Sequence, residues 1–255
     1  MTEKQGAAEW LREKAQGVRR AKGKGAGVSR FIANVSFGKD STAMVYAIVD
    51  HGLPLDEVLY YNTGAEFDAI YDERDRMLPF LASHGIEYTE LRPREPFFYS
   101  MLARPVRSRA TGEVHKHGYG WCGGLCRWGT RLKIDALERY SRGATTYVGI
   151  AADETQRLGR LGAGKAAPLA EFGMTEADCL ALCYERGHEW MQDGVRLYDV
   201  LDRVSCWCCR NKNMRELRAM HDKLPRYWER LVALEDQLGQ MKSKPLHVIG
   251  GEREC

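Results

Sequence analysis

The segment from Phe31 to Thr42 constrains the fold of this 255-residue chain more than any other. It starts with a short apolar run, breaks at Ser36–Ser41 and continues into a helical pattern. The sequence therefore predicts a strand, a loop and the beginning of a helix. A turn ending in Gly38 and the open N-terminus of a helix both present unpaired N–H groups, and the helix adds the positive end of its dipole. We expect this loop to hold a phosphate or sulfate group.

The loop also carries side chains that suit an anion. Ser36, Ser41 and Thr42 add hydroxyl groups, and Lys39 adds a positive charge. The spacing is not that of the Walker loop, in which four residues separate one glycine from Gly-Lys-Ser/Thr. The alternative interpretation is a strand-turn-helix joint whose polar residues bind nothing.

Composition limits the class of protein. The chain has 38 Lys and Arg against 35 Asp and Glu, so its overall charge does not indicate a nucleic-acid binder, and 44% hydrophobic residues support a core. No apolar run approaches the roughly 18 residues of a membrane span. The N-terminus is charged from Glu3 onward, so we expect a cytoplasmic protein. In that compartment, eight cysteines favour metal or sulfur chemistry over a disulfide framework.

Strands and helices are predicted to alternate over residues 31–150. Further strands are expected at Glu57–Tyr61, near Ile86–Leu91 and at Thr145–Ile150, and helices over Thr42–His51 and from about Asp68 to Ser83, the second interrupted at Pro79. This order is typical of the α/β class and predicts a Rossmann-like open parallel sheet flanked by helices. Two more helices, over Asn213–Met220 and Leu224–Leu238, are expected to close the fold.

Polar clusters follow three of the predicted strands directly. They are the loop at Ser36–Ser41, the segment Asn62–Glu66 with Thr63 and Gly64, and the segment Ala151–Arg157 with Arg160 behind it. Because ligands of open parallel sheets bind at the carboxyl ends of the strands, we expect these clusters to form one site. Arg157 and Arg160 are candidate ligands of phosphate or sulfate oxygens, which a guanidinium matches bidentately. The alternative is a surface ion pair with Asp153 or Glu154.

Two pairs of cysteines form the second informative pattern. Cys122 and Cys126 make one pair, and Cys206 and Cys209 make the other, 80 residues later. If the fold brings both loops together, the four thiolates form one metal site. Spacing alone fits either an iron-sulfur cluster or a structural zinc ion.

The remaining cysteines are less informative. Cys208 is spare and could replace a neighbour or serve as a thiol beside the cluster. Cys179 and Cys183 lie one helical turn apart and are more typical of core residues than of ligands. Cys255 is the last residue and is either a sulfur carrier or without a function.

The sequence predicts three regions. Residues 1–28 form a basic N-terminal helix and a Gly-rich joint, whose basic residues are a solvated face or a nucleic-acid contact. Residues 29–160 form a nucleotide-binding α/β domain with an inserted loop at 92–121, and residues 161–255 form a helical region that completes the cysteine cluster. The inserted loop has no clear periodicity. Its aromatic and basic residues suit single-stranded nucleic acid and equally suit a lid over a nucleotide.

Several segments together resemble the phosphoadenosine phosphosulfate reductase family, in its bacterial and phage branch. They are Val35–Met44, Asn62–Phe67, Gly149–Glu154, Ala167–Asp178 and the two cysteine clusters, within a match from Asn34 to about Trp228. The loop at Ser36–Ser41 is similar to the Ser-Gly-Gly-x-Asp-Ser loop of the ATP pyrophosphatase (adenine nucleotide alpha hydrolase) superfamily, with Phe37 in place of the first glycine. The resemblance implies that an adenine nucleotide lies in the cleft.

The resemblance also implies roles for loop residues. The nucleotide phosphates would contact the loop through Ser36, Phe37, Gly38, Lys39, Asp40 and Ser41. Lys39 would neutralise the charge on departing pyrophosphate, and Asp40 would be the carboxylate nearest to Mg²⁺. We count Ser41 with them as a catalytic candidate. Asn62 replaces the usual aspartate of the family, which removes a charge beside the phosphates.

Three hypotheses follow. In the first, the protein is an ATP pyrophosphatase that adenylates a nucleic-acid acceptor for sulfur incorporation, similar to enzymes of DNA phosphorothioation, with a [4Fe-4S] cluster and a cysteine desulfurase as sulfur donor. In the second, it is a reductase of adenylyl sulfate or its 3′-phosphate, with thioredoxin as electron donor and Cys255 as nucleophile. In the third, it is a nucleotide-binding scaffold whose cysteines hold zinc.

Overall fold

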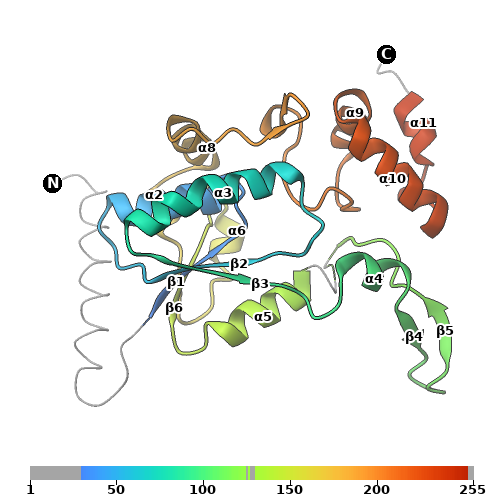
Figure 1. Ribbon diagram of the computed structural model, residues 1–255, viewed down its shortest axis with the longest axis horizontal. Helices are drawn as coiled ribbons and strands as arrows, with labels where there is room; N and C mark the ends of the chain where they lie inside the picture. The colour runs from blue at the N-terminus through green and yellow to red at the C-terminus, as the bar shows by residue number, and fades with distance from the viewer. Residues whose placement is uncertain (1–29, 125, 127–129, 252–255) are drawn as a thin grey trace. The chain divides into compact units, whose positions relative to one another are not determined.

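The computed structural model describes residues 30–124, 126 and 130–251, which form two compact units (Figure 1). The first, here called the sheet unit, contains the described residues up to Tyr61 together with Ile70–Leu91 and Ala136–Glu189. The second, the cysteine unit, contains Asn62–Ala69, Arg92–Asp135 and the chain from Trp190 onward. The basic helix predicted within residues 1–28 and the thiol of Cys255 lie outside the described residues.

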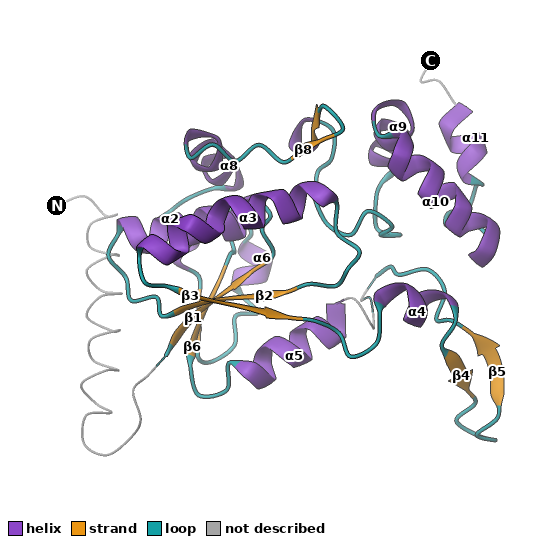
Figure 2. Ribbon diagram, viewed as in Figure 1, coloured by secondary structure: helices purple, strands orange, loops and turns teal. Residues whose placement is uncertain are grey.

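A five-stranded parallel sheet, in the order β3-β2-β1-β6-β7, forms the centre of the sheet unit (Figure 2). Its strands are β1 (Phe31–Val35), β2 (Glu57–Tyr61), β3 (Glu87–Leu91), β6 (Thr145–Val148) and β7 (Lys165–Ala166). Every residue of β2 is buried, as expected of a central strand rich in aromatic and branched side chains. The predicted α/β class and parallel sheet are confirmed.

Helices follow the strands in the expected order. They are α2 (Lys39–Asp50), α3 (Asp68–Ser83), α5 (Leu132–Tyr140), α6 (Thr155–Leu158), α7 (Pro168–Glu171) and α8 (Glu176–Glu185). The expected interruption of α3 is wrong, because the helix continues through Pro79. Pro79 is exposed, so water can satisfy the carbonyl group that its missing N–H leaves without a partner.

The fully buried side chain of His188 connects α2 with α3. Its Nε2 lies 2.7 Å from the Tyr46 hydroxyl, and its Nδ1 lies 2.6 Å from Glu73 Oε2. The backbone N–H of Glu189 donates to the second oxygen of the same carboxylate. These bonds fix the helix that starts at the predicted phosphate loop.

The cysteine unit combines helices and short strands with long irregular segments. Its elements are α4 (Phe97–Leu102), β4 (Pro105–Arg107), β5 (Val114–His117), β8 (Met191–Gln192), β9 (Val195–Arg196), the 3₁₀ helix η2 (Leu197–Asp199), α9 (Met214–Lys223), α10 (Pro225–Leu238) and α11 (Leu246–Gly251). The two closing helices expected from the sequence are present as α9 and α10. The inserted loop at 92–121 contains α4 and an antiparallel hairpin of β4 and β5. Among the described helices, none has the length and hydropathy needed to span a membrane.

Candidate functional site

The predicted phosphate loop connects β1 to α2 and is closed by the Ser41 hydroxyl. This hydroxyl donates to the Gly38 carbonyl over 3.1 Å and accepts from the Ser36 backbone N–H, also over 3.1 Å. Gly38 is the N-cap of α2 and has no side chain that could cap the helix. The first-turn N–H groups of α2 are therefore not capped by that residue and can bind an anion.

Phe37 occupies an unusual backbone position in this loop. Its φ is 54°, in the left-handed region that a bulky residue rarely adopts. The side chain is only 1% exposed and packs against the rings of Tyr60 and Tyr88. A glycine would meet the backbone requirement without strain. In this chain a buried ring occupies the position instead.

Lys39, the first residue of α2, is buried beside two carboxylates. Its Nζ lies 2.6 Å from Asp40 Oδ1 and 3.1 Å from Glu176 Oε2. Burial lowers the pKa of Lys39, but the hydrogen bonds and charges of Asp40 and Glu176 outweigh it, so that the net pKa is raised. The ammonium group is thus charged and held at the start of the helix.

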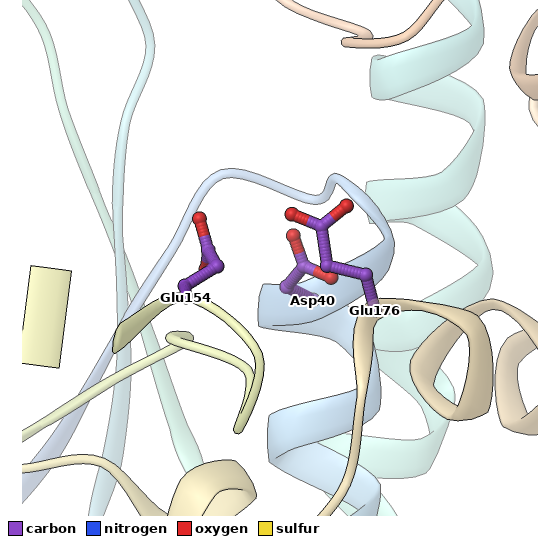
Figure 3. Close-up of side chains that lie close together, drawn as sticks. All are labelled: Asp40, Glu154 and Glu176. Atoms are coloured by element: carbon purple, nitrogen blue, oxygen red, sulfur yellow. The ribbon is translucent and has the colours of Figure 1, made fainter. Parts of the chain in front are cut away.

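Three carboxylates meet at the same place (Figure 3). Asp40, Glu154 and Glu176 each have an oxygen within 4.8 Å of the others, an arrangement that could hold a metal ion. Burial raises the pKa of Asp40, and although Lys39 opposes this effect, the charges of Glu176 and Glu154 add to it. A divalent cation would relieve this repulsion, because hard cations prefer oxygen ligands.

Glu154 and Glu176 reach this position from separate elements. Glu154 is the N-cap of α6 and follows β6, whereas Glu176 starts α8 after the N-cap Thr175. The carboxylate of Asp153 accepts a hydrogen bond from the Glu176 backbone N–H over 3.1 Å, which ties the two segments together. Sequence reasoning identified Asp40 but not its two acidic partners, since spacing along the chain does not reveal which distant residues meet.

Gly149 allows the end of β6 to approach the loop. A Cβ atom at this position would lie 3.0 Å from both Ser41 Cα and Ser41 N, and 3.1 Å from the Asp40 carbonyl carbon. Contacts this short require the backbone to move. The glycine is therefore needed for the close approach of the two segments that carry Asp40 and Glu154.

The two arginines predicted to bind phosphate are placed differently from each other. Nη1 of Arg157 lies 2.6 and 2.7 Å from the two carboxylate oxygens of Glu154, which is the ion pair considered as the alternative. Arg160 follows α6 and is exposed. A phosphate-binding role for either residue remains a proposal.

In the cysteine unit, the two predicted cysteine loops lie side by side. The Arg210 backbone N–H donates to the Cys122 carbonyl over 2.7 Å, and the Cys122 thiol donates to the Cys208 carbonyl over 3.6 Å. The Asn211 side chain bonds both the N–H and the carbonyl of Gly124. Asn211 was not singled out in the sequence, although it aligns the loops.

The candidate ligands Cys122, Cys126, Cys206 and Cys209 interact electrostatically. A hydrogen bond with Cys126 lowers the pKa of Cys122, but its bond to Cys208, burial and neighbouring thiols raise it more. Burial raises the pKa of Cys206, and the charges of Glu66, Cys122 and Cys209 add to this effect. Without a metal the thiols of Cys122 and Cys206 therefore remain protonated at neutral pH.

The segment that follows β2 packs against the second cysteine loop. The Trp207 backbone N–H donates to the Ala65 carbonyl over 3.0 Å, and Thr63 Oγ1 lies 3.9 Å from Cys206 Sγ. The Asn62 side chain accepts from the Gly64 N–H and closes a tight turn in which Gly64 has a φ of 78°. Thr63 and Gly64, predicted to bind nucleotide, thus belong to the cysteine unit.

Lys212 is a buried cation beside these thiols. It is 2% exposed, and among the described residues its Nζ has no hydrogen-bond partner. The ammonium group lies 5.2 Å from the centroid of the Phe67 ring. Burial lowers the pKa of Lys212, and the charges of Glu216 and the nearby cysteines oppose this effect only in part. An isolated buried charge is costly, so this position favours an anion close to Lys212.

Cys179 and Cys183 are fully buried in α8, as expected of core residues. The Cys183 thiol donates to the Lys39 carbonyl over 3.3 Å. The Cys183 thiol therefore packs against the first residue of α2, at the end of the phosphate loop.

Comparisons with known proteins yield likenesses of fold. No family model matches the chain, and no curated protein matches it. One similar solved structure is the U34-tRNA thiolase NcsA from Methanococcus maripaludis with its [4Fe-4S] cluster, at 15% identity and a TM-score of 0.43, covering 96% of this chain and 88% of that one. Another is NMN synthetase from Francisella tularensis, at 15% identity and a TM-score of 0.43, covering 96% and 92%. Neither likeness assigns a function.

Proposed function

We propose that the protein is an ATP pyrophosphatase that adenylates a nucleic-acid acceptor for sulfur incorporation. The observation that carries this proposal is the coincidence of three groups at one point. The uncapped start of α2, the ammonium of Lys39 and the carboxylates of Asp40, Glu154 and Glu176 all meet there.

The carboxylates support a substrate that arrives with a divalent cation. Three carboxylates would repel a bare phosphate or sulfate, whereas the polyphosphate of ATP normally carries Mg²⁺. The three oxygens would hold Mg²⁺, which supplies neutralisation of phosphate charge. Adenylyl sulfate requires no such cation for binding, so this arrangement favours ATP over the reductase substrates.

The residues of the loop have separate roles in this reaction. An acceptor oxygen attacks the α-phosphorus of ATP, the bond to the bridging oxygen breaks, and pyrophosphate leaves with the electron pair. First-turn N–H groups of α2 bind the phosphate oxygens, and Ser41 keeps the loop closed. Asp40 and Glu176 would hold Mg²⁺, and Lys39 beside them would stabilise the charge on the departing pyrophosphate.

The four cysteines fit a [4Fe-4S] cluster. Cys122, Cys126, Cys206 and Cys209 supply four thiols from two aligned loops, and a cluster on four thiolates is an anion that would compensate the buried charge of Lys212. The cluster would hold the two loops or handle sulfur. A zinc ion on the same four thiolates would also form an anionic site that compensates the charge of Lys212. The colour of the protein therefore has to distinguish zinc from an iron-sulfur cluster.

The sulfur source is part of the proposal. A persulfide delivered by a cysteine desulfurase displaces AMP from the adenylated acceptor, and a second thiol then cleaves the S–S bond, leaving a disulfide. The motifs that resemble the phosphoadenosine phosphosulfate reductase family, and within it the enzymes of DNA phosphorothioation, support this chemistry.

Product analysis on anaerobic protein tests the proposal. Pyrophosphate release from ATP is compared with sulfite release from adenylyl sulfate and its 3′-phosphate, using Lys39→Ala as the inactive variant and the exposed Lys223→Ala as the matched control. We expect Mg²⁺-dependent pyrophosphate release that only Lys39→Ala abolishes. Sulfite without pyrophosphate would overturn the proposal and identify a reductase.

Visible absorbance tests the metal site separately. We expect a brown protein that bleaches with dithionite, loses its colour in Cys209→Ala and keeps it in Cys208→Ala. A colourless protein that contains zinc would instead support the scaffold hypothesis.

A further inference from the structure

The hairpin of β4 and β5 projects from the inserted segment of the cysteine unit (Figure 1). Val106 pairs with Lys116 and Pro105 with His117, and a bulge follows Val106. All four residues of β5 are exposed, so both faces of this strand reach solvent. A strand exposed on both faces does not need alternating apolar and polar residues, which explains why the sequence shows no periodicity here.

This segment carries a concentrated positive charge. Residues 92–121 contain six Lys or Arg and two Asp or Glu, so their net charge of +4 exceeds the +3 of the whole chain. On the hairpin itself the exposed cations are Arg107, Arg109 and Lys116. Among the described residues, none of these three forms an ion pair with a carboxylate.

The base of the hairpin is fixed on α4. The N–H groups of Gly118, Tyr119 and Gly120 donate to the carbonyls of Arg104, Ser100 and Met101 over 2.8 to 3.0 Å. Gly118 has a φ of 70°, and a Cβ atom there would lie 2.3 Å from the Met101 carbonyl oxygen. The tip is closed as well, since Arg107 Nη1 donates to the Gly112 carbonyl over 3.0 Å. The basic side chains thus lie on a two-stranded ribbon whose base and tip are held by hydrogen bonds.

We propose that this hairpin binds the sugar-phosphate backbone of nucleic acid. Protein interfaces usually have an apolar centre, whereas the exposed residues of this hairpin are mainly basic and polar. Arginines and lysines that form no ion pair with a carboxylate suit phosphates, and a two-stranded ribbon has the width of a nucleic-acid groove. The identification of the bound nucleic acid as the sulfur acceptor rests on the proposed function.

Fluorescence anisotropy with the full-length protein tests the proposal. The probes are labelled oligonucleotides of one mixed sequence, as single-stranded DNA, duplex DNA and RNA. The variant Arg107→Gln/Arg109→Gln/Lys116→Gln is compared with Arg139→Gln/Arg142→Gln/Lys223→Gln, which removes the same number and types of charge from exposed positions elsewhere.

We expect the hairpin variant to bind about tenfold more weakly, or worse, and the control to bind like the wild type. The slope of log affinity against log salt for a single strand should fall by about 2, since each lost phosphate contact removes about 0.7. Equal loss in the two variants, or equal competition by poly-glutamate, would overturn the proposal.

Pyrophosphate release without nucleic acid separates the two proposals. If the hairpin variant binds normally but loses this release, the hairpin is a lid, and the inference is wrong. Binding that depends on the hairpin in a protein that releases no pyrophosphate would contradict the proposed function and leave this inference standing.

Discussion

The ring of Phe37 meets the ring of Tyr60 edge to face, with centroids 5.0 Å apart, while the Phe37 backbone holds a φ of 54°. A left-handed backbone costs a non-glycine residue about 1–2 kcal/mol. Burial of a phenylalanine side chain contributes about 1.5–3 kcal/mol. The ring therefore outweighs the strain of the backbone, and the loop keeps its shape without the glycine.

This balance predicts that glycine at position 37 gives a more stable protein than alanine, the reverse of the usual order. Both Phe37→Ala and Phe37→Gly lose the buried ring and destabilise the protein, by about 3–5 kcal/mol for the alanine. Because glycine adopts a positive φ without strain, Phe37→Gly should be about 1 kcal/mol more stable than Phe37→Ala. Urea unfolding of both variants measures the difference. A less stable glycine variant would show that the backbone is not strained.

Removal of the Asp40 carboxylate is expected to stabilise the folded protein. Burial raises the pKa of Asp40 above the usual 3.8, so the folded protein binds this proton more tightly than the unfolded chain does. Stability from this group therefore falls as pH rises from about 3.8 through the folded pKa, and the full cost is present at neutral pH. In metal-free buffer, Asp40→Asn should melt at a higher temperature than the wild type at neutral pH.

The same melts contain their own control. The gain should vanish below pH 3.8, and Asp72→Asn, an exposed change on α3, should have no such effect. Millimolar Mg²⁺ should raise the melting temperature of the wild type and leave Asp40→Asn unchanged. A gain in Asp40→Asn that does not depend on pH would contradict this explanation.

Gly149 predicts a loss of activity from a single methyl group. In Gly149→Ala the new Cβ would push against Ser41 and the Asp40 carbonyl carbon, which displaces the start of α2. The backbone has to give by a few tenths of an ångström, less than the shift of about 1 Å that can reduce a rate by about 100-fold, so we expect a loss of about tenfold in pyrophosphate release. Gly162→Ala is the matched control, because nothing lies within 4 Å of a Cβ at that position. Equal rates in the two variants would refute the required close approach.

The substitution Lys212→Met is expected to raise the stability of the apoprotein and to lower the reduction potential of the protein loaded with the proposed cluster. Lys212→Met removes a buried charge, so the apoprotein should become more stable. In the loaded protein it removes a cation that favours the added electron, so the reduction potential should fall, by about 59 mV for each tenfold change in the equilibrium. Redox titration followed by EPR measures this shift, with Lys223→Met as the exposed control. A reduction potential that is the same in Lys212→Met and in the wild type would show that Lys212 does not act on the cluster.

The sequence predicted the sheet and the loop well because both depend on local patterns. The apolar run at Glu57–Tyr61 favours an interior strand, and Gly38 with Lys39 and Asp40 marks the start of α2. Strand β7 was missed, since the two residues Lys165 and Ala166 carry no periodicity.

Features that depend on tertiary contact could not be predicted. Glu176 reaches Asp40 only because α8 packs beside α2. Lys212 follows the cysteines like any surface lysine, and its burial becomes visible only in the folded unit. Arg157 was expected either to bind phosphate or to pair with a nearby carboxylate, and in the structure its guanidinium lies on Glu154.

The interleaving of the two units sets an order of events during protein synthesis. The three segments of the cysteine unit are separated by segments of the sheet unit, and 80 residues separate Cys126 from Cys206. At ~5–20 residues per second, a ribosome needs about 4–16 s to cover this distance. During that interval the nascent chain presents only half of the thiols. On the proposed ligand set, a metal site could therefore be completed only after Cys206 and Cys209 have been synthesised, and a chain that terminates before Cys206 would lack two of its four ligands.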